Sequence, residues 1–127
     1  MTPEQYKVDK REYVRFTLSP MYSSVTARRV GSEEVKELHG HAYDISEAGV
    51  RFELDEAIDP GESIAVDLTL PGTQTAVGAT GDVVWVNDEI DDPGPRRLAI
   101  QFTEFRSEED RFRLLNYLGS AQVRRAA

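Results

Sequence analysis

The chain has 127 residues, enough for one domain with a hydrophobic core and too few for two. It contains no cysteine, which excludes a disulfide framework, a thiolate metal site and a cysteine nucleophile. Its 15 Lys and Arg and 23 Asp and Glu give a net charge of −8, which argues against a general partner of DNA or RNA. Because residues 1–9 are polar and no apolar run reaches the length of a membrane span, we expect a cytoplasmic protein without one.

The charges are distributed unevenly along the sequence. Between Phe52 and Pro95 there is no Lys or Arg, and this stretch holds eleven acidic residues. It contributes −11 to a total of −8, which leaves +3 for the rest of the chain. Most basic residues lie at 7–29 and 96–125, so an anionic ligand is expected on the side that these parts form. The alternative is that the acids only form a solvated face that keeps the protein soluble.

Short strand-like segments alternate with turns along most of the chain. Residues 1–9 are expected to be a flexible N-terminal arm, and 120–127 a C-terminal tail. Gly40 is expected to break the third strand, and Pro and Gly pairs mark several of the turns. Six or seven short antiparallel strands followed by one helix predict an all-β fold with a C-terminal helix, arranged as a small barrel. Alternating apolar residues, or in 76–86 a run that is apolar on both faces, predict strands at 13–18, 21–30, 35–45, 50–54, 64–70, 76–86 and 98–102.

The C-terminal helix is predicted over about 107–119. Ser107 suits the N-cap, and Asp110 falls at the capping-box position, with Asp in place of Glu. An apolar face is expected to pack on the core. Its expected members are Phe112, Leu114, Leu115 and Leu118.

A polar turn separates two of the predicted strands, with the sequence Asp44-Ile45-Ser46-Glu47-Ala48-Gly49. Asp44 and Ser46 can bond nearby backbone amides, and both residue types favour turns. Gly49 can adopt a positive φ without a steric penalty. Taken alone, Asp-x-Ser-x-x-Gly is therefore ordinary turn chemistry, with Glu47 exposed and pointing away.

Two arginines stand where the chain enters its first predicted strand. Arg11 and Arg15 bracket three residues in Lys10-Arg11-Glu12-Tyr13-Val14-Arg15. In an extended chain they share a face, and in a helix they align as i and i+4. In either conformation the two guanidinium groups can converge on one ligand.

An Arg-x-x-x-Arg followed by Asp-x-Ser-x-x-Gly, in this order in a small β-rich domain, resembles the PilZ family over about residues 10–119. The resemblance implies a six-stranded antiparallel barrel of the split-barrel type with a C-terminal helix. It also implies a bacterial receptor for cyclic di-GMP, with no other cofactor, that passes the signal to a downstream protein partner. The ligand-binding residues that it implies are Arg11, Arg15, Asp44, Ser46 and Gly49.

The chemistry of cyclic di-GMP suits these residue types. Arginine presents a planar fork of donors that matches a phosphate or the Hoogsteen edge of guanine, which are the roles expected for Arg11 and Arg15. An ionised Asp44 only accepts hydrogen bonds, and guanine offers it N1–H and N2–H₂, which adenine does not. Ser46 adds a small donor and acceptor. In the family, a basic residue at the position of Lys10 favours an intercalated pair of nucleotides over a single one.

Three other functions compete with the receptor. The first is a PilZ-like adaptor that binds a protein and no nucleotide. The second is an enzyme, although the sequence has no nucleophile elbow, phosphate-binding glycine loop or metal cluster. The third is a barrel for single-stranded nucleic acid, against which the net charge argues. His39 and His41 project from the same side of a strand without an obvious third ligand, so we expect two ordinary strand histidines and no metal site.

Overall fold

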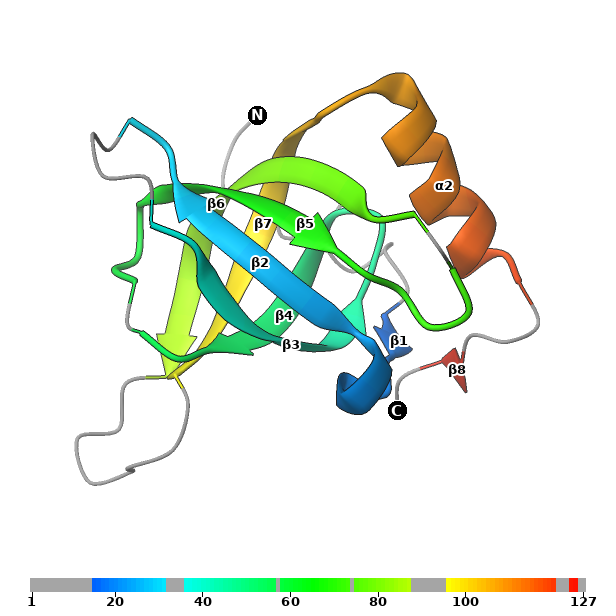
Figure 1. Cartoon of the computed structure of the whole chain (residues 1–127), viewed down its shortest axis with the longest axis horizontal. Helices are drawn as coiled ribbons and strands as arrows, with labels where there is room; N and C mark the ends of the chain where they lie inside the picture. Colours follow the sequence, from blue (N-terminus) through cyan, green and yellow to red (C-terminus); the bar gives the residue numbers. More distant parts are fainter. Residues whose placement is uncertain are drawn as a thin grey trace, which may run out of the picture.

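The computed structural model describes residues 15–31, 36–56, 58–73, 75–87, 96–120 and 124–125 (Figure 1). The expected arm at 1–9, together with Lys10 and Arg11, lies outside these ranges. In chain order the elements are β1 (Phe16–Thr17), η1 (Pro20–Tyr22), β2 (Ser24–Arg29), β3 (Leu38–Ile45), β4 (Gly49–Leu54), β5 (Ser63–Leu68), β6 (Val77–Asn87), β7 (Arg96–Phe105), α2 (Glu108–Leu118) and β8 (Arg124–Arg125). No helix in the described ranges has both the length and the apolar composition needed to cross a membrane.

Six strands close into an antiparallel barrel, as predicted. The hydrogen-bonded order is β2-β5-β6-β7-β4-β3, and β3 pairs back onto β2 to complete the ring (Figure 1). The first half of β3 pairs with β2 and its end pairs with β1, so the ring divides at this strand. β1 therefore continues the sheet outside the barrel, and β8 pairs with the far side of β1.

The core fills the barrel with every second side chain of its strands. Val25 and Ala27 on β2, and Ile64 and Val66 on β5, are buried, whereas their neighbours in the sequence are more exposed. Phe52 on β4 is completely buried. The period-two pattern thus separates an apolar interior from a polar outer face, and ligand-binding groups must lie on that outer face.

Most strand boundaries differ from the prediction by one to three residues, and β7 (Arg96–Phe105) extends beyond the predicted 98–102 at both ends. Two differences have a clear physical reason. The second strand begins at Ser24 and not at Met21, because Pro20–Tyr22 forms a turn of 3-10 helix in which the Ser23 hydroxyl donates to the Ser19 carbonyl at 2.7 Å. The third strand is not broken at Gly40. A Cβ at this position would overlap the carbonyl oxygen of Glu53, so the glycine lets β3 and β4 approach closely.

The helix α2 confirms the predicted N-cap but not the reciprocal half of the capping box. The backbone N–H of Asp110 donates to Ser107 Oγ at 3.2 Å. The buried carboxylate of Asp110 does not turn back to the cap. It accepts from the backbone N–H of Gly78 at 3.1 Å and from Arg106 Nε at 3.0 Å, and it also pairs with Arg113. Asp110 therefore joins the helix to the barrel.

Phe112 was wrongly placed on the buried face of the helix. Its side chain is exposed, whereas Leu114 and Tyr117 are buried together with Asp110. Residues three or four positions apart share one face of a helix, and these three have that spacing. Phe112 lies two positions from both Asp110 and Leu114 and so falls on the other side.

We expect replacement of Asp110 by alanine to lower the free energy of unfolding by about 1–3 kcal/mol, since the buried Gly78 N–H loses its acceptor. Urea denaturation measures this change. Glu109 is the matched control, because it is an exposed acid of the same turn and Glu109→Ala should cost less than about 0.5 kcal/mol. Equal effects of the two substitutions would contradict this role for Asp110.

Candidate functional site

A β-bulge lies just before the polar turn. Along β3 and β4, Ala42 is in register with Phe52, and the next registered pair is Asp44 with Arg51. Tyr43 is therefore an extra residue on β3 without a partner of its own in this register. Bulges are frequent next to binding sites, where they change the direction of a side chain.

The bulge sets the face on which Asp44 lies. Ala42 and Ile45 are both buried in the barrel although they are three positions apart, which a regular strand does not allow. Asp44 shares a cross-strand pair with Arg51, whose side chain is partly exposed. In a regular strand Asp44 would face the interior, as Ala42 does. The extra residue instead places Asp44 on the outer face.

Two arginines hold the carboxylate of Asp44. Arg15 Nη1 donates to Oδ1 at 2.9 Å, and Arg51 Nη1 lies 3.5 Å from Oδ2. The Asp44 side chain is only 13% exposed, compared with 27% for Arg15 and 41% for Arg51. Both carboxylate oxygens are therefore engaged by cations from different segments, one directly before β1 and one on β4, at a position that solvent still reaches.

The turn after Asp44 is closed by its own polar groups. The N–H of Ser46 donates to the carbonyl of Gly49 at 2.9 Å, and the N–H of Ala48 donates to Ser46 Oγ at 3.2 Å. Ser46 is buried and Glu47 is exposed, as expected. The Ser46 hydroxyl accepts one backbone bond and keeps its own proton for another acceptor.

Gly49 serves a different purpose from the predicted one. Within the described ranges, positive φ occurs at Gly31, Gly61 and Gly72 and not at Gly49. A Cβ on Gly49 would instead overlap the carbonyl oxygen of Ile100 on β7. The glycine is therefore required for close packing of β4 on β7, which fixes the base of the turn.

The structure adds three residues to the predicted site. Arg51 contacts Asp44 directly. The pKa of Tyr43 is raised chiefly by burial and next by the nearby charge of Asp44, whereas the charges of Arg51 and Arg97 act to lower it. The phenol of Tyr43 therefore stays neutral, and it lies close enough to Asp44, Arg51 and Arg97 for their charges to act on it. A sequence signal for Arg51 existed, because it is the single Lys or Arg between Lys36 and Arg96.

Four of the five predicted ligand-binding residues gather around the end of β3. Arg15 directly precedes β1 and reaches Asp44 on β3, and the turn formed by Ser46 and Gly49 follows at once. Arg11 lies outside the described residues.

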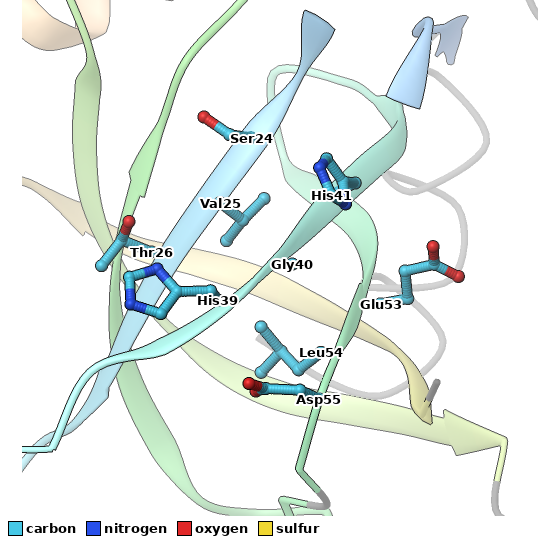
Figure 2. A pocket seen from close by; sticks show the side chains of 9 residues that line it. All are labelled: Ser24, Val25, Thr26, His39, Gly40, His41, Glu53, Leu54 and Asp55. Atoms are coloured by element: carbon cyan, nitrogen blue, oxygen red, sulfur yellow. The ribbon is translucent and has the colours of Figure 1, made fainter. Parts of the chain in front are cut away.

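A hollow of about 430 Å³ lies farther along the outer face, around Gly40. Figure 2 shows that His39 and His41 flank the glycine while the Glu53 side chain points away from it. Within the described ranges, no three His, Asp or Glu side chains are grouped so that they could hold a metal ion. The residues that line the hollow include none of the motif residues, so it is separate from the Asp44 site.

One family model matches most of the chain, and solved structures share its fold. The family model described as PilZ domain matches residues 9–120. The structure is similar to the PilZ domain of Escherichia coli YcgR with c-di-GMP, at a TM-score of 0.66 and 17% identity, and this alignment covers 89% of the present chain and 92% of that domain. No curated protein matches the sequence.

Two longer proteins share the fold. Bacillus subtilis inhibitor of motility (MotI/DgrA) gives a TM-score of 0.63 at 22% identity, with 84% of this chain and 48% of that one covered. Escherichia coli YcgR in complex with c-di-GMP gives 0.61 at 17% identity, with 86% and 46% covered. The present chain thus spans about half the length of these two proteins.

Proposed function

Since the chain belongs to the PilZ domain family, we propose that it is a receptor that binds cyclic di-GMP and passes the signal to a partner protein. The observation that carries the proposal is the Asp44 carboxylate, held between Arg15 and Arg51 on the outer face beside the Ser46 turn. The carboxylate of Asp44 can accept hydrogen bonds from guanine, and the guanidinium groups of Arg15 and Arg51, which can donate to a phosphate, contact it directly. The YcgR domain of the same fold is described with this nucleotide.

The ligand would exchange partners with the protein. Guanine presents N1–H and N2–H₂ side by side, and these donors suit the two oxygens of Asp44, which Arg15 and Arg51 now engage. As the base arrives, Arg15 moves to a phosphate or to a Hoogsteen edge, where its planar fork fits equally well. Each charge keeps an opposite charge or a hydrogen-bond partner throughout, so the exchange leaves no buried charge unpaired.

Arg51 has the geometry of a positioning residue. It lies opposite Asp44 in the register of β3 and β4, and its longer 3.5 Å contact reaches the oxygen that Arg15 does not bind. We propose that it keeps the carboxylate turned toward the ligand after Arg15 has left. Its own charge, and that of Arg97, favour an anion on this face although the whole chain carries −8.

Isothermal titration of the protein with cyclic di-GMP tests the proposal, with GTP and cyclic di-AMP as controls. We expect saturable binding of cyclic di-GMP alone, with an affinity on the order of micromolar or better from a few charge-assisted contacts. A ratio of two nucleotides per site would support the role inferred for Lys10. No heat and no thermal shift would instead favour the protein-binding adaptor.

Replacing Arg15 by alanine should weaken cyclic di-GMP binding about 10-fold to 100-fold, because one charge-assisted contact of roughly 1.5–3 kcal/mol is lost. Arg15→Lys should bind with intermediate affinity, since it keeps the charge but not the planar fork. We extend the proposal to Arg11, whose alanine variant should show a comparable loss in the same titrations.

Arg28→Ala is the matched control for the arginine variants. Arg28 is exposed on β2, so this substitution removes the same charge away from the site. Affinity should also fall with added salt for the wild type, because the contacts are partly exposed. An Arg15→Ala protein that binds as tightly as Arg28→Ala would rule out the assigned contact.

We propose a receptor without catalytic activity. Cyclic di-GMP incubated with the protein should elute unchanged on chromatography, and a linear dinucleotide or GMP among the products would contradict this.

A further inference from the structure

The β-bulge on β3 brings an aromatic side chain next to the proposed binding site. Asp44 is in register with Arg51, and Tyr43 is the extra residue directly before it. In a bulge of this kind two residues of one strand oppose a single residue of the other. Tyr43 and Asp44 are therefore presented together opposite Arg51, and Tyr43 has no cross-strand partner of its own in this register.

The ring of Tyr43 is not part of the barrel core. Within the described residues, the core includes the buried ring of Tyr117, and the ring of Phe16 packs against it, but Tyr43 belongs to neither group. Tyr43 is instead half-buried, so that a ligand can reach it from solvent.

Charged groups of the outer face surround the phenol. The pKa of Tyr43 is raised first by burial and then by the charge of Asp44. Arg51 and Arg97 act to lower it, and Glu53 adds a smaller increase. Glu53 on β4 and Arg97 on β7 are register partners, and solvent reaches both side chains. The phenol thus lies over the outer face of the sheet, on the side of β3 where β4 and β7 follow.

The backbone of the bulge is fixed by the segment that carries Arg15. The N–H of Leu18 donates to the carbonyl of Tyr43 at 2.9 Å, and Leu18 is itself buried. Thr17 on β1 is in register with Asp44. Tyr43 therefore has a fixed backbone between the two segments of the proposed site, which reduces the ordering cost of binding there.

From this geometry we infer that Tyr43 is a further binding residue for the ligand of the Asp44 site, and that a guanine base stacks on the face of its ring. The inference rests on the proposed function and names a contact that the two sequence motifs do not include. Stacking on an aromatic ring tolerates any base, because every base has a flat π-face. Asp44 thus selects guanine by its edge, whereas Tyr43 adds affinity through the face of the base.

Titration of the full chain with cyclic di-GMP tests the inference with two substitutions at one position. Tyr43→Leu stays apolar but removes the flat ring, and it should weaken binding about 5-fold to 20-fold. Tyr43→Phe keeps the ring and loses only the hydroxyl, so it should remain within about twofold of the wild type. Phe112→Leu is the matched control, because it removes an exposed ring on α2, and it should bind like the wild type.

NMR of the bound wild type gives a readout that a merely structural role of Tyr43 would not produce. We expect nuclear Overhauser effects between the ring protons of Tyr43 and the H8 or ribose protons of cyclic di-GMP. The H8 signal should also move upfield on binding to the wild type and to Tyr43→Phe, because a stacked ring shields it. This upfield shift should be lost with Tyr43→Leu.

The outcomes separate this inference from the proposed function. Wild-type binding with equal affinities for Tyr43→Leu and Phe112→Leu, or without Overhauser effects from the Tyr43 ring, would overturn the role of Tyr43 and leave the receptor intact. If Tyr43→Phe were as weak as Tyr43→Leu, the hydroxyl and not the ring would make the contact, and the inference would fail. Should Tyr43→Leu not fold, the Overhauser effects in the wild type decide alone. A wild type that does not bind would overturn both.

Discussion

Replacing Asp44 by alanine should lower the affinity for cyclic di-GMP by at least about 100-fold. The carboxylate is expected to accept two hydrogen bonds from one guanine, each contributing roughly 1.5–3 kcal/mol. Selectivity for cyclic di-GMP over cyclic di-AMP should fall together with the affinity, because the acceptor that distinguishes the two bases is lost. Isothermal titration with both nucleotides measures these changes.

Stability should change much less than affinity in the Asp44→Ala protein. Arg15 and Arg51 lose their shared partner, but both side chains reach solvent, so we expect a loss below about 1 kcal/mol in the free energy of unfolding. Glu47→Ala is the control, since it removes an exposed acid of the same turn and should bind at least as tightly as the wild type. Similar affinities for the two variants would show that Asp44 does not contact the ligand.

A large loss of stability is expected for Gly49→Ala. The new methyl group would overlap the carbonyl of Ile100, and the flanking β4–β7 hydrogen bonds oppose any movement that relieves the overlap. We expect the free energy of unfolding to fall by about 2–4 kcal/mol, within the range of severe overpacking. Urea denaturation monitored by circular dichroism measures it.

Gly119→Ala gives the comparison for this substitution. Gly119 ends α2 at a φ of −83°, and an added Cβ would meet no atom closer than 3.5 Å. Its free energy of unfolding should change by less than about 1 kcal/mol. If Gly49→Ala were equally mild, β4 and β7 would have room to separate, and the assigned reason for the glycine would be wrong.

Much of the fold was predictable because local patterns agree with it. Period-two alternation identified the barrel strands, of which Ile64, Val66 and Leu68 on β5 are the clearest example. The polar turn and the N-cap at Ser107 were visible as short-range chemistry. These signals need only neighbouring residues, and they identify the strands that pair to form the closed barrel.

The features that complete the site depend on contacts between distant segments. The bulge at Tyr43 appears only when β3 is aligned with β4, and the steric need for Gly49 appears only when β7 lies against it. Pairing of β8 with β1 joins the two ends of the chain, so local periodicity at Arg124–Arg125 could not indicate it.

Arg51 shows how a site residue can be missed although its signal is present. In the sequence it belongs to an alternating strand, where a polar residue between Val50 and Phe52 is ordinary. Its importance comes from the partner across the sheet, Asp44, and that pairing exists because the bulge shifts the register. The charge pattern of the sequence did not single out this arginine, and only the cross-strand register assigns it a role.

An amide NMR titration of the wild-type protein with cyclic di-GMP tests the central claim most directly, since it reports binding and location together. We expect the largest shift changes at Arg15, at 44–49 and at Arg51, with little change around the Gly40 hollow or on the exposed side of α2. An unchanged spectrum at saturating nucleotide, or changes concentrated at the hollow or the helix, would contradict a receptor that binds its ligand at Asp44.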